Sequence, residues 1–359
     1  MAGPVGYSLL DRILHRIAFA GPGIQRAAAE IEDRSLAAVW SATAAPRPVF
    51  ITSLPRAGTT ILLEALSRLP GVATHRYRDM PFVMAPVLWA RLSTRFRRPA
   101  ELHERAHGDG IEIGYDSPEA FEEILWRAFW PEKYRGDAIA LSTAGDRSAE
   151  GEAFLAAHMR KIVALRCPED PAGARYVSKN NGNIARLGLL SAAFPAAPVI
   201  VPFRAPLEHA WSMLRQHRNF AALHARDRFA LRYMADLGHY EFGVLHRPIR
   251  FAGLDDLVRG LGSDSLDYWL AYWIAAFEHV LAADDAVVLL RYEELAASGA
   301  EGLAALCERC GLAPCGAVER AAAILHQAPP PRAEAAMLAH PERLDRALDI
   351  EAALARRAH

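Results

Sequence analysis

Cysteine is scarce in this sequence. Only Cys167, Cys307, Cys310 and Cys315 occur among its 359 residues. So few thiols exclude a disulfide framework, and a reducing cytoplasm is the expected location. Cys307 and Cys310 have the spacing of a zinc or redox pair. They fall in a predicted helix with no histidine close by, which favours ordinary thiols over a metal site.

Long uncharged segments are also lacking. The longest runs from Leu187 to Phe203 and contains three prolines, whereas a membrane-spanning helix needs about 20 apolar residues. We therefore predict no integral membrane segment. Charges interrupt the apolar positions of residues 9–17, so the uncharged core of a signal peptide is missing there. These residues predict an amphipathic helix packed on the domain, with membrane-surface or dimer contact as the alternatives.

Neither sign of charge is in excess. The chain has 41 lysines and arginines against 42 aspartates and glutamates, a net charge of −1. This balance gives no indication of nucleic acid as a partner, so any anion must bind locally. The 14 histidines include no pair at metal-ligand spacing backed by carboxylates, and we predict no metal. Hydrophobic residues make up 52% of the chain, enough for a large globular core. The composition leaves the oligomeric state unknown.

A short turn after the first apolar run has the features of an anion-binding loop. It consists of Leu54, Pro55, Arg56, Ala57, Gly58, Thr59 and Thr60. A helix that begins here would direct unpaired backbone N–H groups and the positive end of its dipole at an anion. Gly58 allows close approach of the backbone, and Arg56 adds a fixed charge. The loop is not a Walker A motif, because threonine instead of lysine follows Gly58.

This loop resembles the 5′-phosphate loop of sulfotransferases that use 3′-phosphoadenosine 5′-phosphosulfate (PAPS). The usual form in that family is Pro-Lys/Arg-Ser-Gly-Thr-Thr, and Ala57 stands where serine is common. The resemblance implies that the loop from Arg56 to Thr60 binds the donor nucleotide. A plain strand-to-helix turn that contains a glycine is the alternative.

A second segment strengthens the resemblance. Residues 198–215 predict a strand, then Arg204, then a helix opened by Pro206, with Ser212 two turns along it. An arginine and a hydroxyl so placed can bind one phosphate from two sides. Their eight-residue spacing matches the 3′-phosphate signature of the same family. Two such segments in the right order indicate similarity to the bacterial sulfotransferases.

The strand pattern predicts an α/β fold. Short apolar runs at 48–53, 175–179, 198–203 and 286–291 are each followed by a helix. This is typical of a central parallel sheet flanked by helices in three layers, and the resemblance implies the P-loop NTPase-like sulfotransferase fold. The predicted parts are a helical lead-in over 1–45, a sulfotransferase domain over 46–315, a helical acceptor-side insertion at about 80–170, and a helical tail over 316–359.

Two further residues follow predicted strands. Ligands of parallel sheets bind beyond the carboxyl ends of the strands, so Lys179 and Tyr292 should lie near the two phosphate segments. Lys179 is expected to stabilise charge on the transferring sulfuryl group, or else to be a solvated lysine in a turn. Tyr292 would lie near the nucleotide or pack under the sheet. In the tail, Arg332 is a further possible nucleotide contact suggested by the family.

The general base is the least determined residue. Asp79 aligns with the catalytic glutamate of protein-tyrosine and related sulfotransferases, while His75 is chemically the easier base at neutral pH. Either could instead pair with a neighbouring arginine. The carboxylates of Glu119, Glu122 and Glu123 are alternatives, although that segment also reads as a helix start.

The resemblance implies a PAPS-dependent sulfotransferase that transfers a sulfuryl group to a hydroxyl of a carbohydrate, lipid or small metabolite. Adenosine 3′,5′-bisphosphate (PAP) would be the product, and no metal would be needed because cationic side chains supply the charge. Arg56 would act electrostatically on the leaving phosphate. The alternatives are a phosphotransferase on a similar scaffold, which would need a loop lysine, and a nucleotide-binding protein that has lost catalysis.

Overall fold

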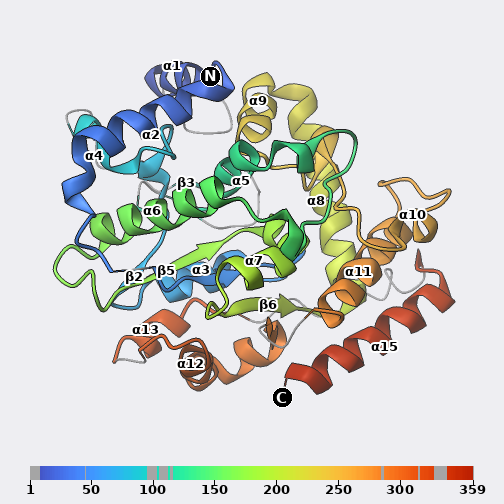
Figure 1. Ribbon diagram of the computed structural model, residues 1–359. Helices are drawn as coiled ribbons and strands as arrows, with labels where there is room; N and C mark the ends of the chain where they lie inside the picture. Colours follow the sequence, from blue (N-terminus) through green and yellow to red (C-terminus); the bar gives the residue numbers. More distant parts are fainter. Residues whose placement is uncertain are drawn as a thin grey trace.

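A five-stranded parallel sheet forms the centre of the protein (Figure 1). The computed structural model describes residues 9–44, 46–94, 103–104, 112–113, 116–283, 287–313, 316–326 and 338–358. The strand order is β2-β5-β1-β6-β7. The strands are β1 (Val49–Ile51), β2 (Val72–Ala73), β5 (Arg175–Lys179), β6 (Val199–Phe203) and β7 (Val287–Arg291). The predicted α/β fold is confirmed, and of these five strands only the two-residue β2 was not predicted.

Alternation along the strands divides the core into two layers. Val49 and Ile51 belong to one hydrophobic cluster and Phe50 to the other, because successive strand residues point to opposite faces. The first face is covered by α3 (Thr59–Ser67), α12 (Tyr292–Arg309) and α13 (Val318–Ala322). The second is covered by α5 (Glu123–Phe129), α6 (Ala149–Arg166), α7 (Leu187–Ala193), α8 (Pro206–Arg226), α11 (Leu266–Leu281) and α15 (Pro341–Ala358). Figure 1 shows α12 and α13 below the sheet and α5 and α6 above it.

The aromatic helix α11 lies inside the second layer. Its Trp269 and Trp273 are fully buried. Trp273 Nε1 donates a hydrogen bond to His209 Nδ1 of α8, at 3.2 Å, so the buried indole N–H is satisfied. This contact ties α11 to the helix that follows β6, and thereby to the edge of the sheet where the site forms.

Helix α9 (Arg228–Leu237) precedes the segment that returns to the phosphate loop. Asp227 caps its first turn by accepting hydrogen bonds from the backbone N–H groups of Phe229 and Ala230, at 2.8 and 3.0 Å. Gly238 ends it with a φ of 82°, a left-handed conformation that favours glycine. A Cβ at Gly238 would lie 2.7 Å from Arg127 Cδ, so glycine also permits close packing there. The segment that follows therefore returns to the carboxyl ends of the strands.

The remaining elements surround this core. The predicted N-terminal helix is α1 (Leu9–Ala18), followed by α2 (Pro22–Leu36). The predominantly helical segment at 80–170 also holds an antiparallel strand pair that was not predicted. Its strands are β3 (His103–Glu104) and β4 (Glu112–Ile113). The other helices are α4 (Pro86–Ser93) and α10 (Leu254–Leu257), with 3₁₀ turns η1 (Ala37–Val39), η2 (Tyr77–Asp79), η3 (Pro131–Tyr134), η4 (Ala144–Asp146), η5 (Asn181–Arg186) and η6 (Gly243–Leu245).

No helix in the described part of the chain is long and apolar enough to cross a membrane. Cys315 and Arg332 lie outside the described residues.

Candidate active site

The predicted phosphate loop is a sharply bent turn between β1 and α3. Arg56 and Gly58 both have positive φ angles, 74° and 94°. Gly58 is the N-cap of α3, and a Cβ there would lie 2.3 Å from Tyr292 Cδ2. Glycine is therefore required both by the backbone conformation and by the close contact with Tyr292. The first N–H groups of α3 have no acceptor within the helix, which makes this end suited to an anion.

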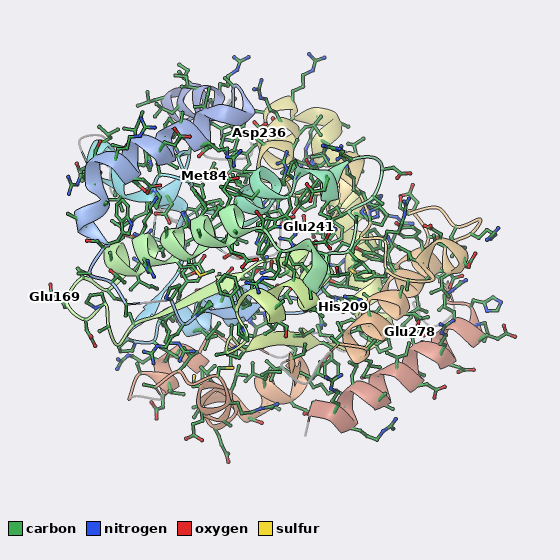
Figure 2. The ribbon with its side chains drawn as sticks, viewed as in Figure 1. Met84, Glu169, His209, Asp236, Glu241 and Glu278 are labelled. Atoms are coloured by element: carbon green, nitrogen blue, oxygen red, sulfur yellow. The ribbon has the colours of Figure 1, made fainter. Side chains whose placement is uncertain are left out.

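A buried histidine fixes the start of this loop. His209 Nε2 donates to the carbonyl oxygen of Pro55, at 2.9 Å, while its Nδ1 accepts from Trp273. Burial, reinforced by the charge of Arg204, lowers the pKa of His209 to about 3. The imidazole is therefore neutral at physiological pH, in the tautomer that both contacts require. Figure 2 shows His209 in the interior of the molecule, unlike Glu169 and Glu278 at its periphery.

The second predicted segment meets the loop directly. Arg204 Nη1 donates to the carbonyl oxygen of Arg56, at 3.1 Å. Arg56 Nε donates to Ser212 Oγ, at 3.3 Å. Tyr292 packs against Gly58 from β7 and α12, so the two phosphate segments and the predicted tyrosine are brought together. Residues far apart in the sequence thus form one cationic corner at the carboxyl ends of β1 and β6.

This corner contains donors suited to a further anion. The Arg204 side chain is only 12% exposed, and its Nε has no hydrogen-bond partner within the described residues. That nitrogen forms an ion pair with the Glu293 carboxylate at 3.6 Å, a separation beyond ordinary hydrogen-bond distance. Because unsatisfied buried donors cost free energy, a phosphate at this position would be stabilising, so the residues present fit a nucleotide with a second phosphate.

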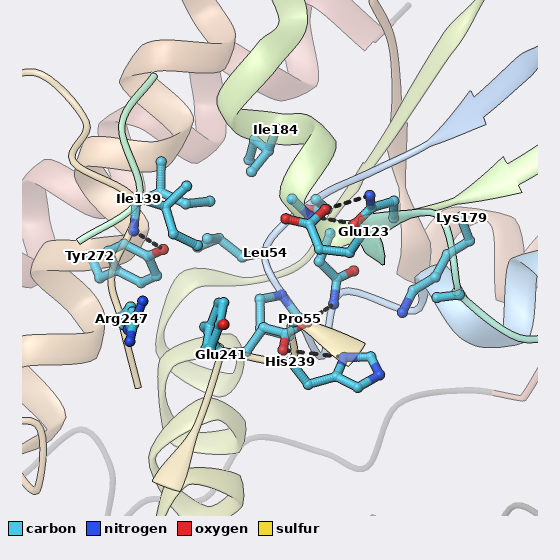
Figure 3. Close-up of a pocket in the computed structure, with 18 residues that line it drawn as sticks. Leu54, Pro55, Glu123, Ile139, Lys179, Ile184, His239, Glu241, Arg247 and Tyr272 are labelled. Atoms are coloured by element: carbon cyan, nitrogen blue, oxygen red, sulfur yellow. Dashed lines mark hydrogen bonds and ion pairs between the residues drawn. The ribbon is translucent and has the colours of Figure 1, made fainter. Parts of the chain in front are cut away.

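Two cavities adjoin the corner and share one wall. The loop cavity reaches Arg56, Thr59, Thr60 and Glu119. The apolar cavity extends past Leu54 to Ile139, Ile184, Ile249, Tyr272 and Arg247 (Figure 3). The residues common to both are Pro55, Lys179, Asn181, His239 and Glu241. Lys179 therefore lies at the carboxyl end of β5 where the two cavities meet, close to the phosphate loop as predicted.

Sequence reasoning missed a histidine and a carboxylate at this junction. His239 Nδ1 lies 3.5 Å from Glu241 Oε2. Burial lowers the pKa of His239, but the Glu241 carboxylate and Glu119 more than offset this, so the net pKa is raised. Burial raises the pKa of Glu241, yet His239 and Lys179 bring it down to about 2. Neither residue belongs to a motif, and only the turn at Gly238 places them here.

Asp79 and His75 lie elsewhere, in a buried cluster behind β5. Asp79 is 2% exposed, forms an ion pair with Arg166, and accepts from the Arg76 backbone N–H at 2.9 Å. Burial alone would raise the pKa of Asp79, but Arg166 and His75 hold it well below its usual range. His75 Nε2 lies 3.0 Å from His158 Nε2, and its Nδ1 lies 3.2 Å from Asp79.

This placement bears on the expected role of these two residues. Neither Asp79 nor His75 is among the residues that line the two cavities. A carboxylate with a strongly lowered pKa and a committed arginine partner is a poor proton acceptor. The structure therefore gives no support to either as the general base. Local sequence suggested a base at this point, but after folding Asp79 is engaged by Arg166 and His75.

The three alternative glutamates separate into different environments. Glu122 accepts from Tyr176 Oη at 3.0 Å, and Glu123 pairs with Arg186 at 3.0 Å, so both are buried and engaged. Glu119 lines the loop cavity and accepts a hydrogen bond from the Ala120 backbone N–H at 2.7 Å. The segment that also read as a helix start precedes α5, which begins at Glu123 and has no side-chain cap.

The site combines cationic and hydroxyl groups at strand ends with two cavities that share lining residues, beside a parallel sheet. These are features of a group-transfer enzyme that binds phosphates. The profile of the sulfotransferase family matches residues 48–314, well over half of the chain. The chain therefore belongs to the sulfotransferase family. The described residues contain no group of three or more candidate metal ligands. Cys307 and Cys310 are free cysteines and belong to no such group.

Solved sulfotransferase structures are similar to this one at low sequence identity. STF9 from Mycobacterium avium is 13% identical, with a TM-score of 0.47, over 89% of this chain and 77% of that one. STF1 from Mycobacterium tuberculosis H37Rv is 16% identical, with a TM-score of 0.44, over 89% and 82%. A sulfotransferase from Alicyclobacillus acidocaldarius is 13% identical, with a TM-score of 0.37, over 88% and 94%. No curated protein matches the sequence.

Proposed function

We propose that this protein transfers a sulfuryl group from PAPS to a hydroxyl of an acceptor and releases PAP. The observation that carries the proposal is the pair of contacts from Arg204 to Arg56 and from Arg56 to Ser212. They bring the two phosphate-binding segments close enough for one nucleotide to bridge them. A nucleotide with phosphates at both its 5′ and 3′ positions is the ligand that such a pair of segments suits.

In this proposal each end of the nucleotide has its own residues. The backbone N–H groups from Ala57 to Thr60 and the hydroxyls of Thr59 and Thr60 bind the 5′-phosphate. Arg204 and Ser212 bind the 3′-phosphate, where the unsatisfied Arg204 Nε supports the assignment. Tyr292 lies against Gly58 and limits how the nucleotide enters the loop.

The nucleotide supplies the activated sulfuryl group. A new bond forms between the acceptor oxygen and sulfur as the bond from sulfur to the 5′-phosphate oxygen breaks, and the acceptor proton must be removed. Arg56 holds the charge that remains on the 5′-phosphate, and Lys179 stabilises the sulfuryl oxygens. Both act as fixed positive charges, so no metal is required of this chain.

We assign the general base to His239. Glu241 lies beside Nδ1 and favours the tautomer that carries its proton there, which leaves Nε2 to accept the acceptor's proton. Glu241 also stabilises the imidazolium that forms. Its own pKa of about 2 makes it a weak base, and Glu119 is already hydrogen-bonded, so His239 is the better candidate.

Isothermal titration with PAP and with ATP tests the proposal. Preference for PAP is expected, because the site offers a second phosphate position but no loop lysine for a triphosphate. Stronger binding of ATP would favour a phosphotransferase. Binding of PAP without sulfation of any hydroxyl compound would favour a nucleotide-binding protein without catalysis. The small number of cysteines supports action in a reducing cytoplasm.

A further inference from the structure

The apolar cavity is lined mainly by hydrocarbon and aromatic surface. Its apolar walls come from Leu54, Ile139, Ile184, Ile249 and Tyr272, and polar residues such as Asn180, Asn181 and Glu123 also line it. Ile139 and Ile249 pair across an isolated bridge, and Tyr272 Oη accepts from the Ile249 backbone N–H at 3.0 Å, so the wall is held firmly. A sugar would lose hydrogen bonds to water on entering such a space, whereas an apolar molecule gains free energy. The lining therefore selects an acceptor with an apolar body.

One cation stands at the far end of this cavity. Figure 3 shows Arg247 beside Tyr272 and Ile139, on the side away from Lys179. The Arg247 Nη1 donates to the Tyr134 carbonyl oxygen at 3.3 Å, and its guanidinium lies 4.6 Å from the ring centre of Tyr240.

Arg247 forms no ion pair with a described residue, although the Glu241 carboxylate lines the same cavity. Arg186 near the same cavity differs, because Glu123 pairs with it at 3.0 Å. A guanidinium has five N–H donors in a planar fork that matches a carboxylate. Arg247 is thus positioned to bind an anionic group of a ligand.

One short segment of the chain carries the residues at both ends of the apolar cavity, His239 and Arg247. Arg247 N donates to the Tyr240 carbonyl oxygen at 2.8 Å, which closes the loop between His239 and Arg247. His239 contacts the junction with the phosphate loop, and Arg247 the opposite end. The distance between proton acceptor and anion site is therefore fixed by the fold.

We propose that the acceptor is a hydroxy acid: an apolar molecule with its hydroxyl at His239 and Lys179 and a carboxylate bound by Arg247. This inference rests on the proposed function and names the acceptor class for that site. It excludes neutral sugars as the preferred acceptors.

Matched acids and amides test the inference in the wild-type protein. The probes are 4-hydroxyphenylacetate, 3-(4-hydroxyphenyl)propionate and 6-hydroxyhexanoate, each beside its neutral amide. Sulfation from PAPS is followed by PAP release and product mass, and binding by calorimetry on the complex with PAP. For at least one pair, kcat/KM is expected to be about tenfold or more higher for the acid, the value of a charge-assisted hydrogen bond.

Variants then assign the preference to Arg247. Arg247→Met keeps much of the side-chain length and should raise KM for the acid by about tenfold or more, with little change for the amide. Arg247→Lys should retain part of the preference. Arg250→Met is the matched control, because Arg250 is 55% exposed and pairs with Asp137 outside the cavity.

The outcomes separate this inference from the function on which it rests. Failure of PAP to bind refutes the proposed function. If PAP binds but no acid binds the complex, or if acid and amide are used equally, the hydroxy-acid inference is wrong and the function stands. The same holds if Arg247→Met lowers both activities equally. The comparison in the wild-type protein remains decisive even if the variant does not fold.

Discussion

Replacement of Arg204 by alanine tests the central geometric feature of the site. The Arg204 side chain is 12% exposed, its Nη1 donates to the Arg56 carbonyl, and its Nε has no hydrogen-bond partner in the described residues. If Nε and a second nitrogen donate to the 3′-phosphate, the substitution removes two charge-assisted hydrogen bonds. At about 1.5 kcal/mol each, the loss is about 3 kcal/mol, or roughly 100-fold in Kd.

The assay compares PAP with adenosine 5′-monophosphate, which lacks the 3′-phosphate. Isothermal titration should show a large loss of PAP affinity in Arg204→Ala and a much smaller change for the monophosphate. Ser212→Ala should act in the same direction, with a smaller effect of about 1 kcal/mol. Arg215→Ala provides a control on the same helix, because Arg215 is exposed.

One result would refute the assignment. If Arg204→Ala weakens both nucleotides equally, the arginine supports the loop and does not contact the 3′-phosphate. Thermal unfolding of the variant separates this from a general loss of structure, since its Tm should stay near that of the wild type if only ligand contacts are lost.

Three further predictions follow from the same geometry. His239→Ala should lower kcat by about 10²- to 10⁴-fold with PAP affinity unchanged. Glu241→Gln should move the acidic limb of the pH–rate profile to lower pH, because the Glu241 carboxylate raises the pKa of His239. An acidic limb that does not move would count against His239 as the base. Gly58→Ala should destabilise the fold by at least about 1 kcal/mol in denaturant unfolding and abolish PAP binding, since the new methyl meets Tyr292 at positive φ; retention of both would show that the turn can relax. The folded-state pKa of Asp79 is lowered, so its contribution to stability is present above the unfolded pKa of about 3.9 and is lost as pH falls towards the lower folded value. Asp79→Asn should lower the free energy of unfolding at pH 7 by about 3 kcal/mol and flatten its dependence on acid pH. An unchanged unfolding curve would contradict the buried ion pair.

The sequence alone indicated most strands of the sheet and located the two segments that we propose to bind phosphate. β1, β6 and β7 are short apolar runs, and the residues after them could be recognised from local order: the turn at Gly58, and Arg204 eight residues before Ser212. Such features are local because a strand, a tight turn and a helix start each depend on neighbouring residues. Since parallel strands end at one edge of a sheet, the meeting of the two segments could be expected as well.

Only the tertiary structure decided which groups line the two cavities. Asp79 was expected as the base from its alignment with the family and is buried against Arg166, whereas His239 belonged to no motif and reaches the cavity through the turn at Gly238. The proton affinity of a side chain depends on burial and on charges contributed by distant segments. Those partners are far apart in sequence, so their effect on the chemistry appears only when the chain has folded.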